Sequence, residues 1–178
     1  ENNASQSKNR IPIMKRRNFL QAGALCGGAA AAAGTAHGAE GNPSGVAGYQ
    51  YRLPGFKEGS RLLFIGDSIT DMKWGRNEKD RNHYLGHSYV YLIASRLGVD
   101  MPQARLEFFN RGISGNKVSD LKARWQKDAI NMKPDLLSIL IGVNDVSRGG
   151  TVEQWEADYR FILDASRKAK ADLPLVLL

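Results

Sequence analysis

The chain has 178 residues, with 25 lysines and arginines against 18 acidic residues and a formal net charge of +7 at pH 7. Residues 1–39 hold five of the basic residues and one of the acidic residues, which leaves 20 basic and 17 acidic residues in the rest. That remainder has no basic run interleaved with aromatic residues, so the composition argues against a nucleic-acid-binding protein. The single cysteine, Cys26, lies in the first 39 residues and histidine is scarce, so no disulfide, metal site or cofactor is predicted.

Residues 1–39 have the layout of an export signal. A cationic segment precedes an uncharged stretch rich in alanine and glycine, and small residues suited to cleavage follow, after Ala36 or Gly38. The core at residues 16–20, Arg-Arg-Asn-Phe-Leu, resembles the bacterial twin-arginine signal, which implies the twin-arginine export machinery as a partner and a periplasmic or secreted protein. A membrane anchor is the alternative, but glycine and poly-alanine make a poor lipid-facing helix, so no stable anchor is expected. Met14 is a candidate for the natural start.

Residues 40–60, rich in glycine and proline, are interpreted as a linker, and residues 61–178 as the domain. Within the domain, apolar runs alternate with stretches of helical periodicity. This alternation predicts an α/β fold with a mostly parallel sheet and helices on both faces. The predicted strands are residues 61–66, 105–110, 136–142 and 173–178, and the predicted helices are residues 88–97, 118–129 and 152–171.

The last predicted helix carries the clearest local signals. Thr151 and Gln154 have the spacing of a capping box, in which each side chain satisfies an unpaired backbone N–H at the helix start. Trp155, Tyr159 and Ile162 then follow one face at helical spacing. The two aromatic residues are expected to join the core rather than to form a platform for a ligand.

Polar segments follow the first three predicted strands. They are Gly-Asp-Ser-Ile-Thr at residues 66–70, Gly-Ile-Ser-Gly-Asn at 112–116 and Gly-Val-Asn-Asp at 142–145. Each segment alone could be an ordinary turn, because glycine, aspartate and serine all favour turns. In open α/β sheets, however, ligands bind beyond the carboxyl ends of the strands. Three such segments, each after a strand, therefore predict one shared site.

In order and spacing these segments resemble the first three sequence blocks of the SGNH hydrolases, the GDSL-type esterases and lipases. The resemblance covers roughly residues 61–178 and implies a three-layer α/β/α, flavodoxin-like parallel sheet. It implies that Ser68 is the nucleophile, and that the N–H groups of Ser68 and Gly115 and the side-chain amide of Asn144 form the oxyanion hole. The fourth block, Asp-x-x-His, is absent. The catalytic histidine and aspartate are therefore expected beyond Leu178, with a last strand and helix, and residues 40–178 alone are expected to be inactive and prone to aggregation.

These residue types suit ester hydrolysis. A serine hydroxyl needs a neighbouring base to become a nucleophile, and one oxyanion donor is worth roughly 3–4 kcal/mol. Glycine at 115 would let the backbone approach the substrate closely, and the amide of Asn144 donates without carrying a charge. Asp67 adjoins Ser68, but an unperturbed carboxylate is a poor base for a hydroxyl. Asp67 is predicted to hydrogen-bond the loop backbone, and it is also counted among the candidate substrate-binding residues.

None of the three histidines, His37, His83 and His87, follows an aspartate at the family's spacing. His83 and His87 are predicted to contact substrate or to cap the surface rather than to act as the base. With Trp74 and Tyr84 they belong to a polar and aromatic segment that is typical of a sugar-binding rim, which also contains Arg76, Asn77 and Asn82. The favoured function is therefore hydrolysis of acyl esters, chiefly acetyl esters of carbohydrate. The alternatives are a lipase or lysophospholipase of the same family, or a non-catalytic carbohydrate-binding relative.

Overall fold

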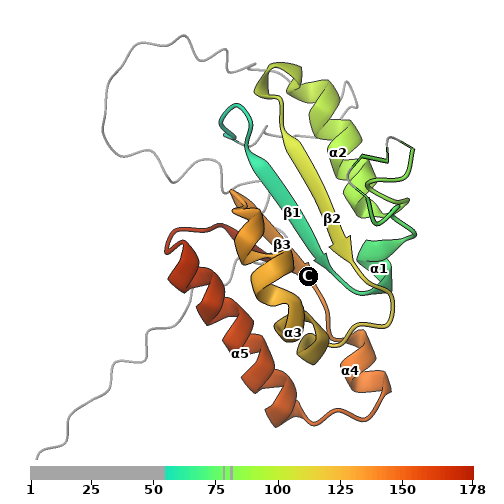
Figure 1. The fold of residues 1–178 in the computed structure, drawn as a ribbon, viewed down its shortest axis with the longest axis vertical. Coiled ribbons are helices and arrows are strands. Elements are labelled where there is room, and N and C mark those ends of the chain that lie inside the picture. The colour runs from blue at the N-terminus through green and yellow to red at the C-terminus, as the bar shows by residue number, and fades with distance from the viewer. Residues whose placement is uncertain (1–54, 78, 81) are drawn as a thin grey trace, which may run out of the picture.

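The computed structural model describes residues 55–77, 79–80 and 82–178 (Figure 1). The predicted export signal and most of the predicted linker lie outside the described residues. The described residues form a four-stranded parallel sheet with the strand order β2-β1-β3-β4, which confirms the predicted α/β fold. The strands are β1 (Arg61–Gly66), β2 (Glu107–Gly112), β3 (Leu136–Leu140) and β4 (Leu175–Leu177). The helices are α1 (Ser68–Asp71), α2 (Tyr89–Asp100), η3 (Pro102–Ala104), α3 (Val118–Asp128), η4 (Ile130–Met132), α4 (Val143–Ser147) and α5 (Val152–Ala169).

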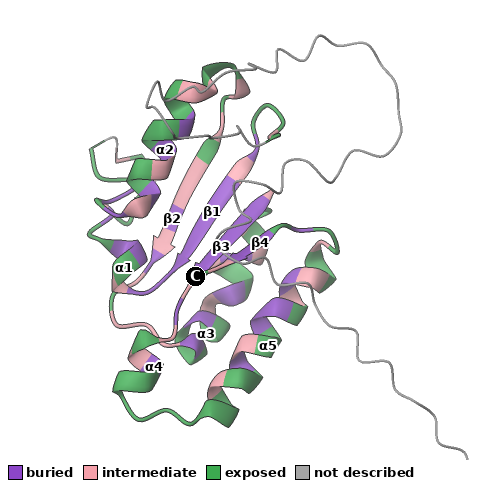
Figure 2. Ribbon diagram, turned by 180° about the vertical axis from the view of Figure 1, so that it is seen from behind, coloured by how far each residue is buried: buried purple, intermediate pink, exposed green. Residues whose placement is uncertain are grey.

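Helices cover both faces of the sheet, as predicted. Successive side chains of a strand point to opposite faces, so Leu63 and Ile65 of β1 pack with α3 and α5, whereas Leu62 and Phe64 pack with α2. Figure 2 shows β1 and β3 mostly in the buried class, between the inward faces of these helices. Burial on both faces explains why the central strands are nearly continuous apolar runs rather than alternating ones.

The predicted core face of α5 is confirmed. Ile162 is fully buried, and Trp155 and Tyr159 pack against the same cluster. The hydroxyl of Thr151 caps the first turn by accepting the N–H of Gln154 at 3.3 Å. The side chain of Gln154 does not complete the predicted capping box. It donates instead to Oδ2 of Asp158 at 3.1 Å, one turn further along the helix.

Strands β2, β3 and β4 differ from their predicted limits, and β4 covers only Leu175–Leu177 of the predicted residues 173–178. The predicted start of β2 at residue 105 is two residues early, because Arg105 ends η3 in the left-handed region with φ of 45° and the extended backbone begins only at Glu107. The strand then continues to Gly112, which pairs with Gly66 of β1. Strand β3 stops at Leu140, because Gly142, with φ of 130°, turns the chain directly into α4.

The short helices α1 and α4 are absent from the predicted elements. Each begins within three residues of a strand's end and spans only four or five residues. Such a length is too short to show a helical period in the sequence. Both helices lie at the carboxyl end of the sheet, where the polar segments were predicted to converge (Figure 1). No helix in the described part of the chain is long and apolar enough to cross a membrane.

Candidate active site

The carboxyl ends of β1, β2 and β3 lie at one level. The register pairs Gly66 of β1 with Gly112 of β2 and with Leu140 of β3. The three polar segments therefore leave the sheet side by side, as parallel pairing of neighbouring strands requires. The structure brings the segments carrying Ser68, Gly115 and Asn144 to the same edge of the sheet.

Ser68 is the first residue of α1, directly after the residue that caps this helix. The capping residue is Asp67, whose Oδ1 accepts the N–H of Ile69 at 2.9 Å. The side chain of Asp67 is fully buried, and its Oδ2 has no hydrogen-bond partner among the described residues. Asp67 thus bonds the loop backbone. Ser68 is half-buried, and its hydroxyl makes no hydrogen bond within the described residues.

Each of the three polar segments carries one hydrogen-bond donor of the predicted oxyanion hole. The N–H groups of Ser68 and Gly115 have no acceptor among the described residues. Gly115 has φ of 82°, in the left-handed region that glycine adopts without strain. Asn144, in the first turn of α4, donates one amide N–H to the carbonyl oxygen of Asn116 at 3.0 Å. Because a side-chain amide carries two donors, a second N–H of Asn144 remains for another acceptor.

Arg124 of α3 joins the first and second polar segments. Its Nε donates to Oδ1 of Asn116 at 3.0 Å, and one of its terminal nitrogens approaches the carbonyl oxygen of Gly66 at 3.5 Å. The guanidinium is also paired with Asp128 at 2.9 Å. Burial lowers the pKa of Arg124 although the hydrogen bond to Asp128 raises it. The guanidinium remains charged, since arginine does not deprotonate in proteins.

The second and third polar segments are joined by two further contacts. The N–H of Val118, at the start of α3, donates to both carboxylate oxygens of the buried Asp145, at 3.1 and 3.2 Å. Arg148, at the end of α4, donates to the carbonyl oxygen of Gly115 at 3.1 Å. With the bond from Asn144 to Asn116, these contacts hold α4 against the segment that carries Gly115.

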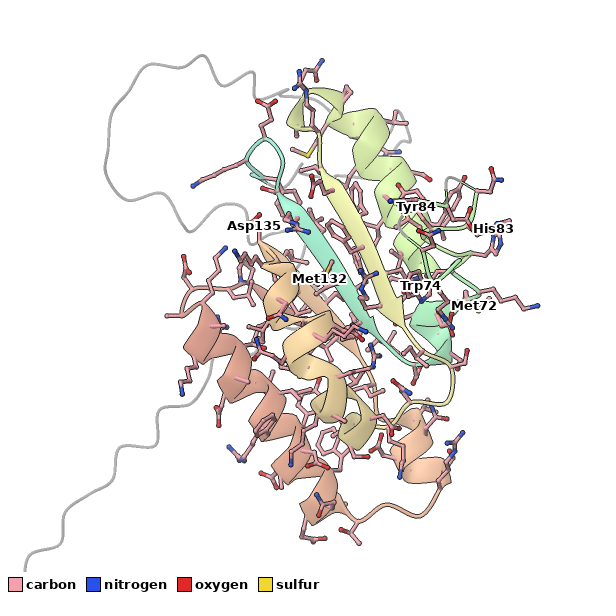
Figure 3. The ribbon with its side chains drawn as sticks, in the orientation of Figure 1. Met72, Trp74, His83, Tyr84, Met132 and Asp135 are labelled. Carbon is pink, nitrogen blue, oxygen red and sulfur yellow. The ribbon has the colours of Figure 1, made fainter. Side chains whose placement is uncertain are left out.

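Two residues of the predicted sugar-binding rim have their polar groups bonded within the protein, although the side chain of Arg76 is 50% exposed. Trp74 is buried, and its Nε1 donates to the carbonyl oxygen of Gly112 at 2.7 Å, beside the end of β2 (Figure 3). Its indole N–H is therefore occupied within the protein. Arg76 is paired with the buried carboxylate of Asp71, with nitrogen–oxygen distances of 2.8 and 2.6 Å.

The two described histidines lie apart from Ser68 in the hydrogen-bond network. His83 is on the outer side of the segment between α1 and α2 (Figure 3), with its Nδ1 3.8 Å from Oδ2 of Asp80. The ring of His87 packs edge-on against the ring of His83 at 5.8 Å. Both side chains are exposed. Neither forms a hydrogen bond to Ser68 in the described part of the chain.

An apolar groove of about 650 Å³ opens on the α2 face of the sheet next to the site. Eight of its ten lining residues are aliphatic or phenylalanine, and the others are Tyr89 and Ser138. Two of the eight, Ile69 and Val143, are the chain neighbours of Ser68 and Asn144. Burial raises the pKa of Tyr89, although hydrogen bonds to Thr70 and Ser138 oppose the shift. The groove, named here the α2 groove, offers an apolar surface beside the predicted nucleophile.

Sequence reasoning missed the charged residues that hold the site segments together, namely Asp71, Arg124, Asp145 and Arg148. Their partners are distant in sequence: Arg124 is 58 positions from Gly66, and Asp145 is 27 positions from Val118. No local sequence pattern indicates that such distant residues will pair. The available signals were the position of Asp71 three residues after Ser68 and the place of Asp145 at the end of the third polar segment.

Residues 64–178 match the sequence profile of the GDSL-like lipase/acylhydrolase family. The chain is 50% identical over 91 residues to an acetylxylan esterase from Geobacillus stearothermophilus. These 91 residues are 51% of this chain and 42% of that protein. It is also 28% identical over 86 residues to the uncharacterized lipoprotein YqeF from Bacillus subtilis, which covers 48% of this chain and 32% of that protein.

Solved structures agree with the sequence matches. A crystal structure described as a GDSL-like lipase, from Parabacteroides merdae, has a TM-score of 0.64 at 38% identity. A catalytic mutant of an acetylxylan esterase from Geobacillus stearothermophilus has a TM-score of 0.61 at 37% identity. Each alignment covers 68% of this chain and 60% of the solved chain. Because the family match takes in all three polar segments and more than half of the sequence, the chain belongs to the GDSL-like lipase/acylhydrolase family.

Proposed function

We propose that the protein is a serine esterase that removes acetyl groups from carbohydrate. The observation that carries the proposal is the common level at which β1, β2 and β3 end, with Ser68, Gly115 and Asn144 on the three segments that follow. The 50% identity to an acetylxylan esterase supports an acetylated carbohydrate as substrate. The chain covers 42% of that relative, so the reaction of the whole protein is part of the proposal.

In the proposed reaction the hydroxyl oxygen of Ser68 attacks the acetyl carbon while a base takes its proton. The N–H groups of Ser68 and Gly115 and the amide of Asn144 then stabilise the negative charge on the carbonyl oxygen. The tetrahedral intermediate expels the sugar oxygen, which takes the proton from the base to become a hydroxyl, and acetyl-Ser68 remains. Water, deprotonated by the same base, then attacks the acetyl carbon, and the base returns the proton to the oxygen of Ser68 as acetate leaves.

We assign the base to a histidine of an Asp-x-x-His segment beyond Leu178, from the order of the sequence blocks in the family. The exposed positions of His83 and His87, and their contacts with Asp80 and with each other, support this assignment. His83→Ala and His87→Ala are therefore expected to keep most of the esterase activity. Loss of turnover in either folded variant would locate the base inside residues 1–178.

The test uses full-length protein and p-nitrophenyl acetate. Ser68→Ala is expected to lower turnover by about 10⁴-fold or more, because the nucleophile is lost. The thermal unfolding midpoint is expected to stay unchanged, since the Ser68 hydroxyl has no hydrogen bond among the described residues. Ser119→Ala, an exposed serine of α3, is the matched control and should keep full activity. Full turnover by a folded Ser68→Ala protein would exclude the serine mechanism.

A second candidate is a lipase or lysophospholipase, which the match to the GDSL-like lipase/acylhydrolase family also supports. Rates with p-nitrophenyl acetate and p-nitrophenyl octanoate separate the two candidates. The acetyl esterase predicts the higher kcat/KM with acetate and release of acetate from acetylated xylooligosaccharides. The lipase predicts the higher kcat/KM with octanoate.

We also propose that residues 1–39 direct the protein to the periplasm or the outside of the cell through the twin-arginine machinery. The Arg16-Arg17 pair and the weakly apolar stretch after it support this proposal. Replacing both arginines by lysine is expected to keep the protein in the cytoplasmic fraction. Unchanged export would show that another route is used.

A further inference from the structure

A buried carboxylate lies three residues after the proposed nucleophile. Asp71, the last residue of α1, is 1% exposed. Its Oδ1 accepts a hydrogen bond from Arg76 at 2.8 Å. Its Oδ2 accepts three more, from Arg76 at 2.6 Å, from the N–H of Ser114 at 2.8 Å and from the hydroxyl of Ser114 at 2.7 Å. Both oxygens are thus occupied, and the two-pronged pairing with Arg76 is the strongest type of side-chain hydrogen bond.

One partner of Asp71, Ser114, belongs to the segment that carries Gly115, and the other partner, Arg76, also bonds to that segment. Ser114 is the residue directly before Gly115. Arg76 also donates to the carbonyl oxygen of Gly112 at 3.2 Å, the oxygen that accepts the indole N–H of Trp74. A Cβ at Gly112 would collide with the backbone nitrogen of Asp71, so only glycine allows this close approach. The segment therefore meets α1 at two points: Gly112 packs against the backbone of Asp71, and Ser114 hydrogen-bonds to its carboxylate.

The charges in this cluster favour a fixed geometry. Burial alone would raise the pKa of Asp71, but hydrogen bonds from Arg76 and Ser114 outweigh burial and lower it. The carboxylate is therefore ionised at neutral pH and holds its donors firmly. Removal of Arg76 would leave a buried negative charge with fewer partners, and the carboxylate that orients Ser114 would lose the group that fixes its position.

We propose that Asp71, through Arg76 and Ser114, is a positioning residue that sets the N–H of Gly115 relative to Ser68. The proposal rests on the esterase function proposed above, in which this N–H is an oxyanion donor. An oxyanion hole needs donors held to within about 0.5 Å of the productive geometry, and a misplacement of about 1 Å can cost 10²-fold in rate. The ion pair between Asp71 and Arg76 therefore acts on the rate through Gly115, without touching the substrate itself.

The test compares Arg76→Ala with Arg160→Ala in full-length protein. Arg160 forms an arginine–carboxylate pair with Glu156 on the exposed side of α5, at 2.6 Å, and is the matched control. Arg76→Ala is expected to lower kcat by about 10–10²-fold and to leave KM nearly unchanged, because a displaced oxyanion donor matters chiefly in the transition state. Arg160→Ala is expected to keep both constants. An unchanged kcat in Arg76→Ala would overturn the proposal.

Chemical rescue adds a readout that general destabilisation would not give. The side chain of Arg76 is 50% exposed, so guanidinium ions can reach the space it leaves. Added guanidinium is expected to restore part of kcat in Arg76→Ala. Methylammonium, which cannot form the two-pronged pair with Asp71, is expected to restore little. Equal restoration by both cations would show that charge alone matters and would contradict the positioning role.

Hydrogen exchange separates failure of this inference from failure of the proposed function. The exchange of backbone amides at residues 112–116 is measured in Arg76→Ala and in the milder Arg76→Lys, with Arg160→Ala as control. Faster exchange at these residues, larger in Arg76→Ala, is expected whether or not the protein hydrolyses esters. Unchanged exchange would show that Asp71 and Arg76 do not hold residues 112–116 in place. An inactive wild-type protein with faster exchange in Arg76→Ala would overturn the proposed esterase function, and with it the effect of Asp71 on the rate, but not the attachment of residues 112–116 by Asp71 and Arg76.

Discussion

The carboxyl edge of the sheet and the core beneath α3 and α5 are held together by different interactions. At the edge, hydrogen bonds from Arg76, Arg124 and Arg148 fix backbone segments to one another. In the core, Leu63 and Trp125 are buried in an apolar cluster. The first region sets the positions of individual donors, and the second excludes water from the sheet.

This contrast indicates that activity and stability depend on different residues. Apolar burial is not directional and scales with area, so losses in the core should lower stability broadly. Hydrogen bonds depend on distance and angle, so the loss of one hydrogen bond at the edge should displace only the donors next to it. The predictions below test whether the two regions can be disturbed separately.

The largest effect on stability is expected for Trp125→Ala in α3. Trp125 is 1% exposed, and its indole N–H donates to the hydroxyl of Ser166 at 3.1 Å. Its removal leaves a cavity and an unmet hydrogen bond, for an expected loss of about 3–5 kcal/mol in the free energy of unfolding. Chemical denaturation measures this loss, with Lys127→Ala on the exposed side of α3 as control. A fall in kcat at temperatures where the variant is folded would show that the regions are coupled.

A comparable effect on activity is expected for Asn144→Ala at the edge. The variant loses a proposed oxyanion donor, so kcat should fall by about 10²–10³-fold with KM nearly unchanged. Steady-state kinetics with p-nitrophenyl acetate measure both constants. Ser147→Ala, an exposed residue of the same helix α4, serves as control. A rise in KM with kcat unchanged would show instead that Asn144 binds the substrate in its ground state.

The smallest effect is expected for Asp135→Asn, at the opposite end of the sheet from the site. Oδ2 of Asp135 accepts the N–H of Arg61 at 3.0 Å, and Oδ1 accepts from Lys170 at 3.0 Å. The bond from Arg61 is the main reason why the pKa of Asp135 lies below 3.8, although burial opposes the shift. Since the folded-state pKa is the lower one, the ionised carboxylate stabilises the protein above the unfolded pKa.

This contribution is lost as the pH falls through the lowered pKa. Because the side chain of Asp135 is 44% exposed, the expected difference in unfolding free energy at neutral pH is only about 1 kcal/mol or less. Urea denaturation of wild type and Asp135→Asn across a pH series measures it, with the exposed Asp164→Asn as control. A difference in unfolding free energy between wild type and Asp135→Asn that grows toward acid pH would show that folding raises the pKa of Asp135 rather than lowering it.

The sequence determined most of the sheet and the identity of the site segments. Strand β1 and the start of β3 lie where continuous apolar runs predicted them, because burial on both faces demands such runs. Helix α5 follows its period of apolar residues, and its start follows the cap at Thr151. The three polar segments stand out because each directly follows an apolar run, so local order along the chain is enough to find them.

Only the tertiary structure decided how those segments are held. Trp74 was predicted at a sugar-binding rim, but it points to the carbonyl oxygen of Gly112, 38 positions away. Asp71 and Ser114 are 43 positions apart in sequence and hydrogen-bonded in space. Such partners follow from strand register and from the direction in which each short helix leaves the sheet. A local pattern records burial and periodicity, but it carries no information on which distant donor meets which acceptor.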